Sequence, residues 1–244
     1  MTVDTSIGGS GFRFPQTRLS VIAELGSPDA ALRASACGKI VAAYWKPAYK
    51  HVRLRWKASN EDAKDLTQGF FTCALDQAFF GDFDPAKGTF RTYLRTCLDR
   101  FVAKENQSAR RLKRGGGITL VSLDFDGAER ELALSTPAAE DCFDREWVRS
   151  LFELAIAALR QRCEAEGKQV QFRIFERYDL KAPEERITYE ALAREFGVTP
   201  AAVTNYLAAM RRDLRRMVLD KLREITCGER EFRREARALL GIEI

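Results

Sequence analysis

A stretch near the end of the chain carries side chains suited to contacting DNA. From residue 201 onward, small and polar residues give way to arginines along one expected helix face: Ala201, Thr204, Asn205, Ala208, Arg211, Arg212, Arg215 and Arg216. Small and polar side chains near the start of a helix can enter the major groove and hydrogen-bond to base edges, while arginines further along neutralise phosphates. This order of residue types therefore predicts a DNA-binding helix.

Two helices joined by a sharp turn would position that face. Thr188 is suited to cap a first helix that ends at Phe196, and Gly197 provides the permissive residue that the turn needs. Thr199 is suited to cap the second helix, with Pro200 as its first residue. An ordinary helical hairpin with a solvated charged face is the alternative. The combination of caps, turn glycine and basic tail favours a helix-turn-helix.

A second candidate nucleic-acid surface is expected on a long helix from Thr89 to about Arg114. Its apolar stripe is spaced at intervals of three and four residues: Phe90, Leu94, Cys97, Leu98 and Phe101. An adjoining face combines an aromatic ring with basic and polar side chains: Tyr93, Arg100, Lys104, Gln107 and Arg111. Aromatic rings stack on unpaired bases and basic groups neutralise phosphates. For Phe90, a core position is the competing explanation.

The sequence lacks the residue patterns that are typical of catalytic sites and metal sites. The six cysteines include no C-x-x-C pair, and His51 is the only histidine, for which a surface or packing role is expected. Gly115-Gly116-Gly117 lacks the lysine and hydroxyl residues of a phosphate-binding loop. We therefore expect a protein that is not an enzyme and needs no cofactor or metal.

The elements that must position these residues are helical nearly throughout. Helices are expected after Ser27-Pro28, with an interruption at Pro47, and again after Asn60 as a cap. Residues 118–143 are rich in Asp and Glu, so they are expected to form an acidic linker. The predicted fold is all-α, with two small helical domains. We expect a flexible arm (1–24), a first domain (25–114), the linker (115–142), a second domain (143–223) and a C-terminal extension (224–244).

Composition agrees with a globular protein that has a charged surface. Hydrophobic residues make up 45% and charged residues 31% of the 244 residues, and the formal net charge is +5. No apolar run approaches the roughly 20 residues of a membrane span, and the N-terminus has no apolar core of a signal peptide. A cytoplasmic location without membrane insertion is expected.

At this point the motifs resemble a known family. Asp62-Ala63-Lys64-Asp65-Leu66-Thr67-Gln68-Gly69-Phe70-Phe71 resembles the D-A-E-D-L-x-Q-x-x-F motif of sigma-70 factors. The segment from Gly88 to Arg114 resembles their promoter-melting helix, and the helix-turn-helix resembles their region four. In order and spacing, the match over roughly residues 25–220 is similar to the small extracytoplasmic-function (ECF) sigma factors, which keep only regions two and four.

The resemblance implies roles in transcription initiation. Core RNA polymerase would be bound through residues of the first motif: Asp62, Asp65, Leu66, Gln68 and Phe70. The minus-ten promoter element would be recognised and melted by Phe83, Thr89, Tyr93, Arg100, Lys104, Gln107 and Arg111. The minus-thirty-five element would be read by Thr199, Ala201, Thr204, Asn205, Ala208, Arg211, Arg212 and Arg215. The acidic linker would thread a channel of the polymerase.

The sequence departs from the family in two motifs. Lys64 stands where the family usually has Glu, which predicts weaker polymerase binding unless a regulatory kinase phosphorylates Ser59 or Thr67. Tyr93 stands where a tryptophan is expected. The C-terminal extension could add a helix over region four or bind a partner, and an anti-sigma factor is one such partner.

Two other functions stay open on the sequence. A helix-turn-helix regulator that does not contact polymerase would explain only the C-terminal half. A degenerate sigma homologue that sequesters a partner would explain Lys64. The basic helix and the acidic linker adjoin in the chain, which would also suit a compact inhibited form of an initiating factor.

Overall fold

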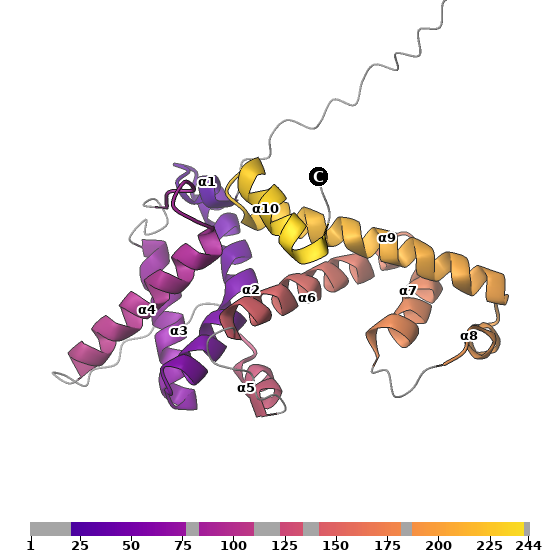
Figure 1. Cartoon of the computed structure of the whole chain (residues 1–244), viewed down its shortest axis with the longest axis horizontal. Coiled ribbons are helices and arrows are strands. Elements are labelled where there is room, and N and C mark those ends of the chain that lie inside the picture. Colours follow the sequence, from indigo (N-terminus) through magenta and orange to yellow (C-terminus); the bar gives the residue numbers. More distant parts are fainter. Residues whose placement is uncertain (1–20, 77–82, 110–122, 134–141, 182–186, 242–244) are drawn as a thin grey trace, which may run out of the picture.

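The computed structural model describes residues 21–76, 83–109, 123–133, 142–181 and 187–241, and most of these residues lie in helices (Figure 1). The predicted all-α class is confirmed. The elements are α1 (Val21–Leu25), α2 (Ala30–Arg55), α3 (Asn60–Asp76), α4 (Phe90–Ala109), α5 (Phe125–Ala133), α6 (Cys142–Ala165), α7 (Gln169–Phe175), a π-helical turn η2 (Glu176–Leu180), α8 (Tyr189–Phe196), α9 (Pro200–Ile225) and α10 (Glu229–Leu240). No helix in these ranges is long and apolar enough to cross a membrane.

The N-terminal helices differ from the sequence prediction at two points. Pro47 lies inside α2, which continues without interruption to Arg55, so the predicted break is wrong. Residues on both sides of Pro47 are buried, and this packing offsets the hydrogen bond that a proline cannot donate. At the start of α3, Ser59 is the capping residue in place of Asn60, since the Ser59 hydroxyl accepts a hydrogen bond from the Asp62 amide at 3.1 Å.

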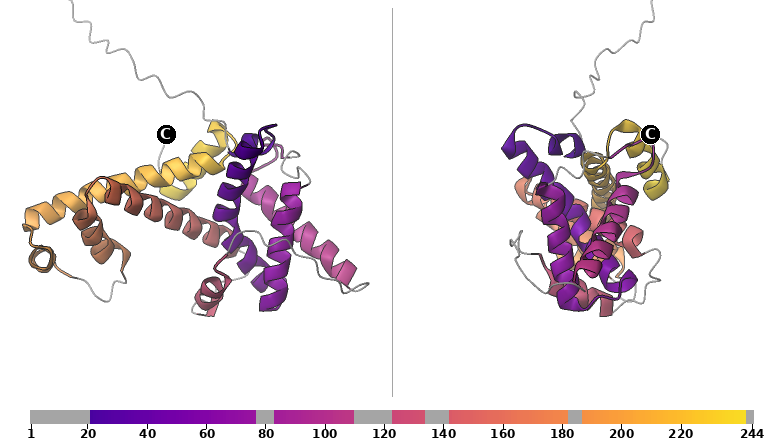
Figure 2. Two further views of the ribbon diagram at one scale, coloured as in Figure 1. Left: turned by 180° about the vertical axis from the view of Figure 1, so that it is seen from behind. Right: turned by 90° about the vertical axis from the view of Figure 1, so that its left-hand side faces the viewer.

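Two apolar clusters hold the helices together. The first surrounds α2 and includes Tyr44, Phe90 and Trp147, and the second joins α7, α8 and the start of α9 around Phe175 and Leu207. Helices α6 and α9 each contribute to both clusters, and they run side by side from one to the other (Figures 1 and 2). Because continuous helices connect the two cores, the prediction of two domains separated by a linker is not confirmed.

Part of the predicted acidic linker is the short helix α5, which packs against α2. Its Phe125 ring contacts the rings of Trp45 and Tyr49, with centroid distances of 5.4 and 5.1 Å. Glu129 lies 2.5 Å from the Arg53 guanidinium and accepts a hydrogen bond from the Tyr49 hydroxyl at 2.7 Å. The linker is therefore anchored within residues 125–133, and its acidic side chains contact basic side chains of α2.

The contact between Arg53 and Glu129 predicts a dependence of stability on pH. Hydrogen bonds from Arg53 lower the pKa of Glu129 below its usual 4.5. A carboxylate with a lowered pKa in the folded state stabilises the fold fully above its unfolded-state pKa, and this contribution is lost as the pH falls through the folded-state value. In denaturant titrations between pH 6 and pH 3, wild type should lose about 1 kcal/mol more stability than Glu129→Gln. The matched control is Glu195→Gln at an exposed position. Identical acid profiles for wild type and Glu129→Gln would contradict the expectation.

Candidate nucleic-acid interface

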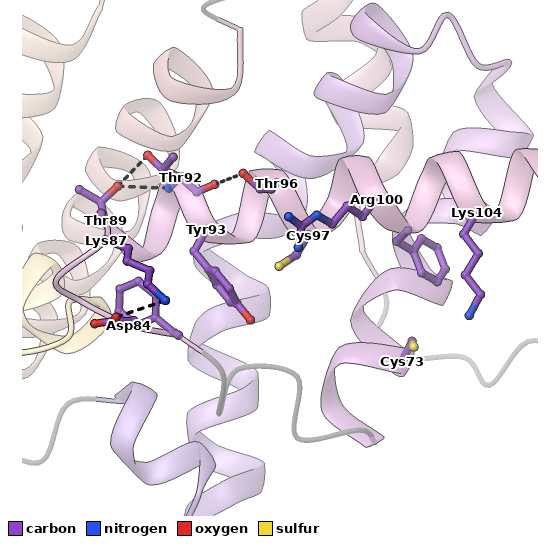
Figure 3. Close-up of a pocket in the computed structure, with 13 residues that line it drawn as sticks. Cys73, Asp84, Lys87, Thr89, Thr92, Tyr93, Thr96, Cys97, Arg100 and Lys104 are labelled. Atoms are coloured by element: carbon purple, nitrogen blue, oxygen red, sulfur yellow. Dashed lines mark hydrogen bonds and ion pairs between the residues drawn. The ribbon is translucent and has the colours of Figure 1, made fainter.

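A groove of about 610 Å³ lies along α4 and combines aromatic, hydroxyl and basic side chains (Figure 3). Its walls come from α4, from residues 83–89 before it and from Cys73 of α3. The aromatic rings are Phe83, Tyr93 and Phe101; the hydroxyls are Thr89, Thr92 and Thr96; the basic groups are Lys87, Arg100 and Lys104. This set of groups can stack on bases, hydrogen-bond to polar edges and neutralise phosphates.

The start of α4 is fixed by its cap and by aromatic packing. The Thr89 hydroxyl accepts a hydrogen bond from the Thr92 amide at 3.2 Å. Phe90 is fully buried and packs edge to face with the rings of Tyr44 and Phe83, with ring centroids 5.8 and 5.4 Å apart. Phe90 is therefore a core residue that orients the helix. Tyr93, half-buried, packs beside Phe83 with ring centroids 5.4 Å apart and stays on the wall of the groove.

Positive charge predominates at the rim of the groove. Arg100 and Lys104 are exposed and one turn apart on α4, and neither has an ion-pair partner among the described residues. Tyr93 and Lys104 project from the same side of α4 (Figure 3). Asp84 is the acidic residue among the side chains that line the groove. It lies 3.6 Å from Lys87, so it offsets the positive charge of that lysine alone. The groove is thus suited to an anionic ligand with flat rings.

The groove brings together most of the residues predicted for the minus-ten element. Phe83, Thr89, Tyr93, Arg100 and Lys104 all line it. Gln107 is exposed further along α4 and is not in the lining, and Arg111 lies outside the described residues.

The sequence analysis missed several lining residues, among them Lys87, Thr92 and Thr96. The two threonines follow Thr89 at intervals of three and four, so helical spacing was a signal that could have found them.

The predicted helix-turn-helix is formed by α8 and α9, and its local geometry is confirmed. The Thr188 hydroxyl accepts a hydrogen bond from the Ala191 amide and the Thr199 hydroxyl one from the Ala202 amide, both at 3.2 Å. Gly197 ends α8 with φ 66°, in the left-handed region that a side chain disfavours. Pro200 is the first residue of α9. The turn is therefore built from the residues that local chemistry favours.

The face predicted to read the minus-thirty-five element is largely accessible. The predicted residues are exposed except Ala208, which is half-buried: Thr199, Ala201, Thr204, Asn205, Arg211, Arg212 and Arg215. Three of them already have partners: the Thr199 hydroxyl caps α9, the Thr204 hydroxyl donates a hydrogen bond to the Pro200 carbonyl at 3.2 Å, and the Arg211 guanidinium forms two hydrogen bonds to Asp179, at 2.8 and 2.9 Å. Asn205 and Arg212 are the residues best placed to contact a ligand, and the Thr204 oxygen can still accept a hydrogen bond.

The residues predicted to bind polymerase divide between surface and core. Asp62 and Asp65 are exposed on α3, whereas Leu66 and Gln68 are half-buried. Phe70 is only 1% exposed and packs on Phe71 and Phe101, so a direct contact of Phe70 with a partner is contradicted. Its place in the motif is explained by its role in the core.

Lys64 and its neighbours also bear on the predicted phosphorylation. Lys64 lies 3.2 Å from Glu61 and 3.5 Å from Asp126 of α5. Thr67 is fully buried, which makes it inaccessible to a kinase in this conformation. Ser59 is exposed, and its hydroxyl donates a hydrogen bond to Asp62 at 2.7 Å. Of the two predicted modification sites, only Ser59 is accessible.

Comparisons of the chain with protein-family models, with curated proteins and with solved structures found no match.

Proposed function

We propose that the protein is an initiation factor of the ECF sigma type, which binds core RNA polymerase, recognises two promoter elements and promotes DNA melting. The groove along α4 is the observation that carries this proposal. Five of the residues predicted for the minus-ten element converge there with additional hydroxyl and basic groups. A double-stranded DNA reader needs no aromatic groove, whereas a protein that holds unpaired bases does.

Each kind of side chain in the groove would contribute to DNA melting in a different way. Tyr93 and Phe83 would stack on a base that leaves the duplex, which offsets the cost of unstacking it. The hydroxyls of Thr92 and Thr96 already bond to the Thr89 hydroxyl and to the Thr92 carbonyl, at 2.9 Å each, so their oxygens would accept hydrogen bonds from the polar edge of that base. Arg100 and Lys104 would hold the phosphates of the unpaired strand. The protein acts here by binding the melted state more tightly than the duplex, so no reacting group is needed.

The second interface would read duplex DNA upstream. The exposed start of α9 presents Thr204 and Asn205, which can hydrogen-bond to base edges in the major groove. Arg212 and Arg215 follow about two and three turns later and would contact phosphates. The α6–α9 helix pair links this interface to the core that carries the groove. Such a link would set the separation of the two promoter elements.

Binding to core polymerase is tested by charge reversal on α3. Asp65→Arg should weaken the affinity for purified bacterial core polymerase at least about tenfold, because a like-charge contact costs more than about 1.4 kcal/mol. The control is Asp220→Arg, an equal charge reversal at an exposed position of α9. Affinity can be measured by fluorescence anisotropy of the labelled protein. Wild-type affinity retained by Asp65→Arg, or equal losses in both variants, would contradict the proposed binding surface.

A further inference from the structure

The C-terminal helix α10 separates its charges by face. Its two central glutamates, Glu231 and Glu235, are buried together with Phe232 and Ala236. Its arginines point the other way and are exposed: Arg230, Arg233, Arg234 and Arg237. The exposed acid of the helix, Glu229, pairs with Arg233 at 2.9 Å. The outer face of α10 is therefore strongly basic, although the helix as a whole is nearly neutral.

The buried acids fix α10 beside the start of α4. Glu231 accepts a hydrogen bond from the Phe90 amide at 2.6 Å and another from the Cys227 amide at 2.7 Å. Glu235 lies 3.3 Å from the Arg91 guanidinium. The expectation that the C-terminal extension adds a helix is thus confirmed, but α10 packs at the α4 end of α9, away from the helix-turn-helix (Figure 1).

This attachment places α10 beside the end of the groove, with its basic face on the side that points away from α4. Phe90 directly follows Thr89, and the stretch Lys87–Gly88–Thr89 belongs to the groove lining. Arg223 of α9 also contacts α10, because its guanidinium lies over the Phe232 ring, 4.0 Å from the ring centroid. The Arg223 side chain is exposed. Arg223 extends the arginine surface onto α9. A polyanion that leaves the groove at its Thr89 end would meet α10 there and would have to continue along the outer side of that helix to contact the arginines.

We propose that the exposed arginines of α10 form a further DNA-binding surface, which contacts the phosphate backbone of duplex DNA next to the groove. The inference rests on the proposed function, since it extends the DNA path assigned there. Arg230, Arg234 and Arg237 span about 10 Å of helix axis. One DNA strand presents about three phosphates over that length.

Charge and burial favour DNA over a membrane. A helix that binds a lipid surface inserts its apolar face, but Phe232 and Ala236 of α10 are buried in the protein core, and the half-buried Leu239 and Leu240 pack against it. The exposed guanidinium groups of Arg230 and Arg234 can act as phosphate ligands without insertion. Contacts of this kind are independent of base sequence. They would add affinity and orientation, not promoter choice.

The test measures binding of full-length protein to a labelled random-sequence duplex over a range of salt concentrations, without polymerase. Arg230→Gln/Arg234→Gln should weaken binding about tenfold per arginine near 0.1 M salt and reduce the slope of log K against log salt by about 2. The control variant, Arg55→Gln/Arg130→Gln, removes two exposed arginines from other helices. Circular dichroism spectra of both variants check that the helices are intact.

The following outcomes test the proposed α10 surface separately from the proposed function. Equal affinities and slopes for the α10 variant and the control would overturn it, as would the absence of wild-type duplex binding at low salt. Loss of binding by the α10 variant to phosphatidylserine vesicles or to polyglutamate, but not to DNA, would also overturn it. Polymerase-dependent transcription can succeed or fail independently of this result, so the two proposals stay distinguishable.

Discussion

Replacing Lys50 with methionine is expected to lower the free energy of unfolding by about 3–5 kcal/mol. The Lys50 side chain is completely buried in the middle of α2. Its ammonium group lies 2.7 Å from Glu131 of α5 and 2.7 Å from Glu146 of α6. Methionine keeps most of the volume but removes the buried cation, and the Arg149 guanidinium that remains lies farther from the two carboxylates, at 3.7 Å from Glu131 and 3.6 Å from Glu146. Urea denaturation followed by circular dichroism measures the loss.

Lys46 provides a matched control for Lys50. It lies one turn earlier on α2 and pairs with Glu131 at 3.1 Å and Glu153 at 3.0 Å, but it is partly exposed. Because water screens the charges of Lys46 and its partners, Lys46→Met should lower the free energy of unfolding by only about 1 kcal/mol. Equal losses in the two variants, or a Lys50→Met protein as stable as wild type, would show that the buried charge cluster does not anchor α5 and α6.

Tyr93→Ala is expected to reduce promoter opening roughly 5- to 150-fold, because stacking of one base on an aromatic ring contributes about 1–3 kcal/mol. Tyr93→Phe keeps the ring and should retain most of the opening. Fluorescence of 2-aminopurine placed in the minus-ten element reports opening in the presence of core polymerase. Since Tyr93 also packs beside Phe83, unfolding curves must show that the alanine variant is folded.

Two other results for promoter opening would contradict the stacking of a base on the Tyr93 ring. If Tyr93→Phe lost as much opening as Tyr93→Ala, the hydroxyl and not stacking would be responsible. If neither variant lost opening, the groove would not hold an unpaired base.

Local chemistry made the helix-turn-helix predictable from the sequence. Thr188, Gly197, Thr199 and Pro200 each act within four residues of their own position, so their types specify the turn. The groove was predictable in part for the same reason, because Tyr93, Arg100 and Lys104 share one face of a single helix. Lys87 was missed because its place in the lining depends on how a preceding loop packs on α4.

The features that the sequence did not predict depend on contacts between residues that are distant in the sequence. Acidic composition suggested a linker, but Glu129 is held by Arg53, a residue 76 positions earlier in the chain. Pro47 suggested an interruption, whereas burial on both sides keeps α2 continuous. Phe70 lies in a motif associated with polymerase binding, yet its ring is part of the core. In each case the partners are distant in sequence, so spacing alone gave no signal.

The α5 contacts bear on the suggested inhibited form, although the basic residues 110–114 lie outside the described residues. The acidic linker and the basic end of the α4 helix adjoin in sequence, which suggested that they would pair. Among the described residues, the acids of α5 instead contact basic side chains of α2 and α3, including Arg53, Lys50 and Lys64. Arg100 and Lys104 thus stay available at the groove.

Run-off transcription with purified core polymerase on a pool of randomised promoter templates tests the proposed function most directly. We expect transcripts that require the protein, that disappear with Asp65→Arg and that persist with Asp220→Arg. Transcripts that do not depend on the protein, or that Asp65→Arg leaves unchanged, would contradict a sigma factor that binds polymerase through α3.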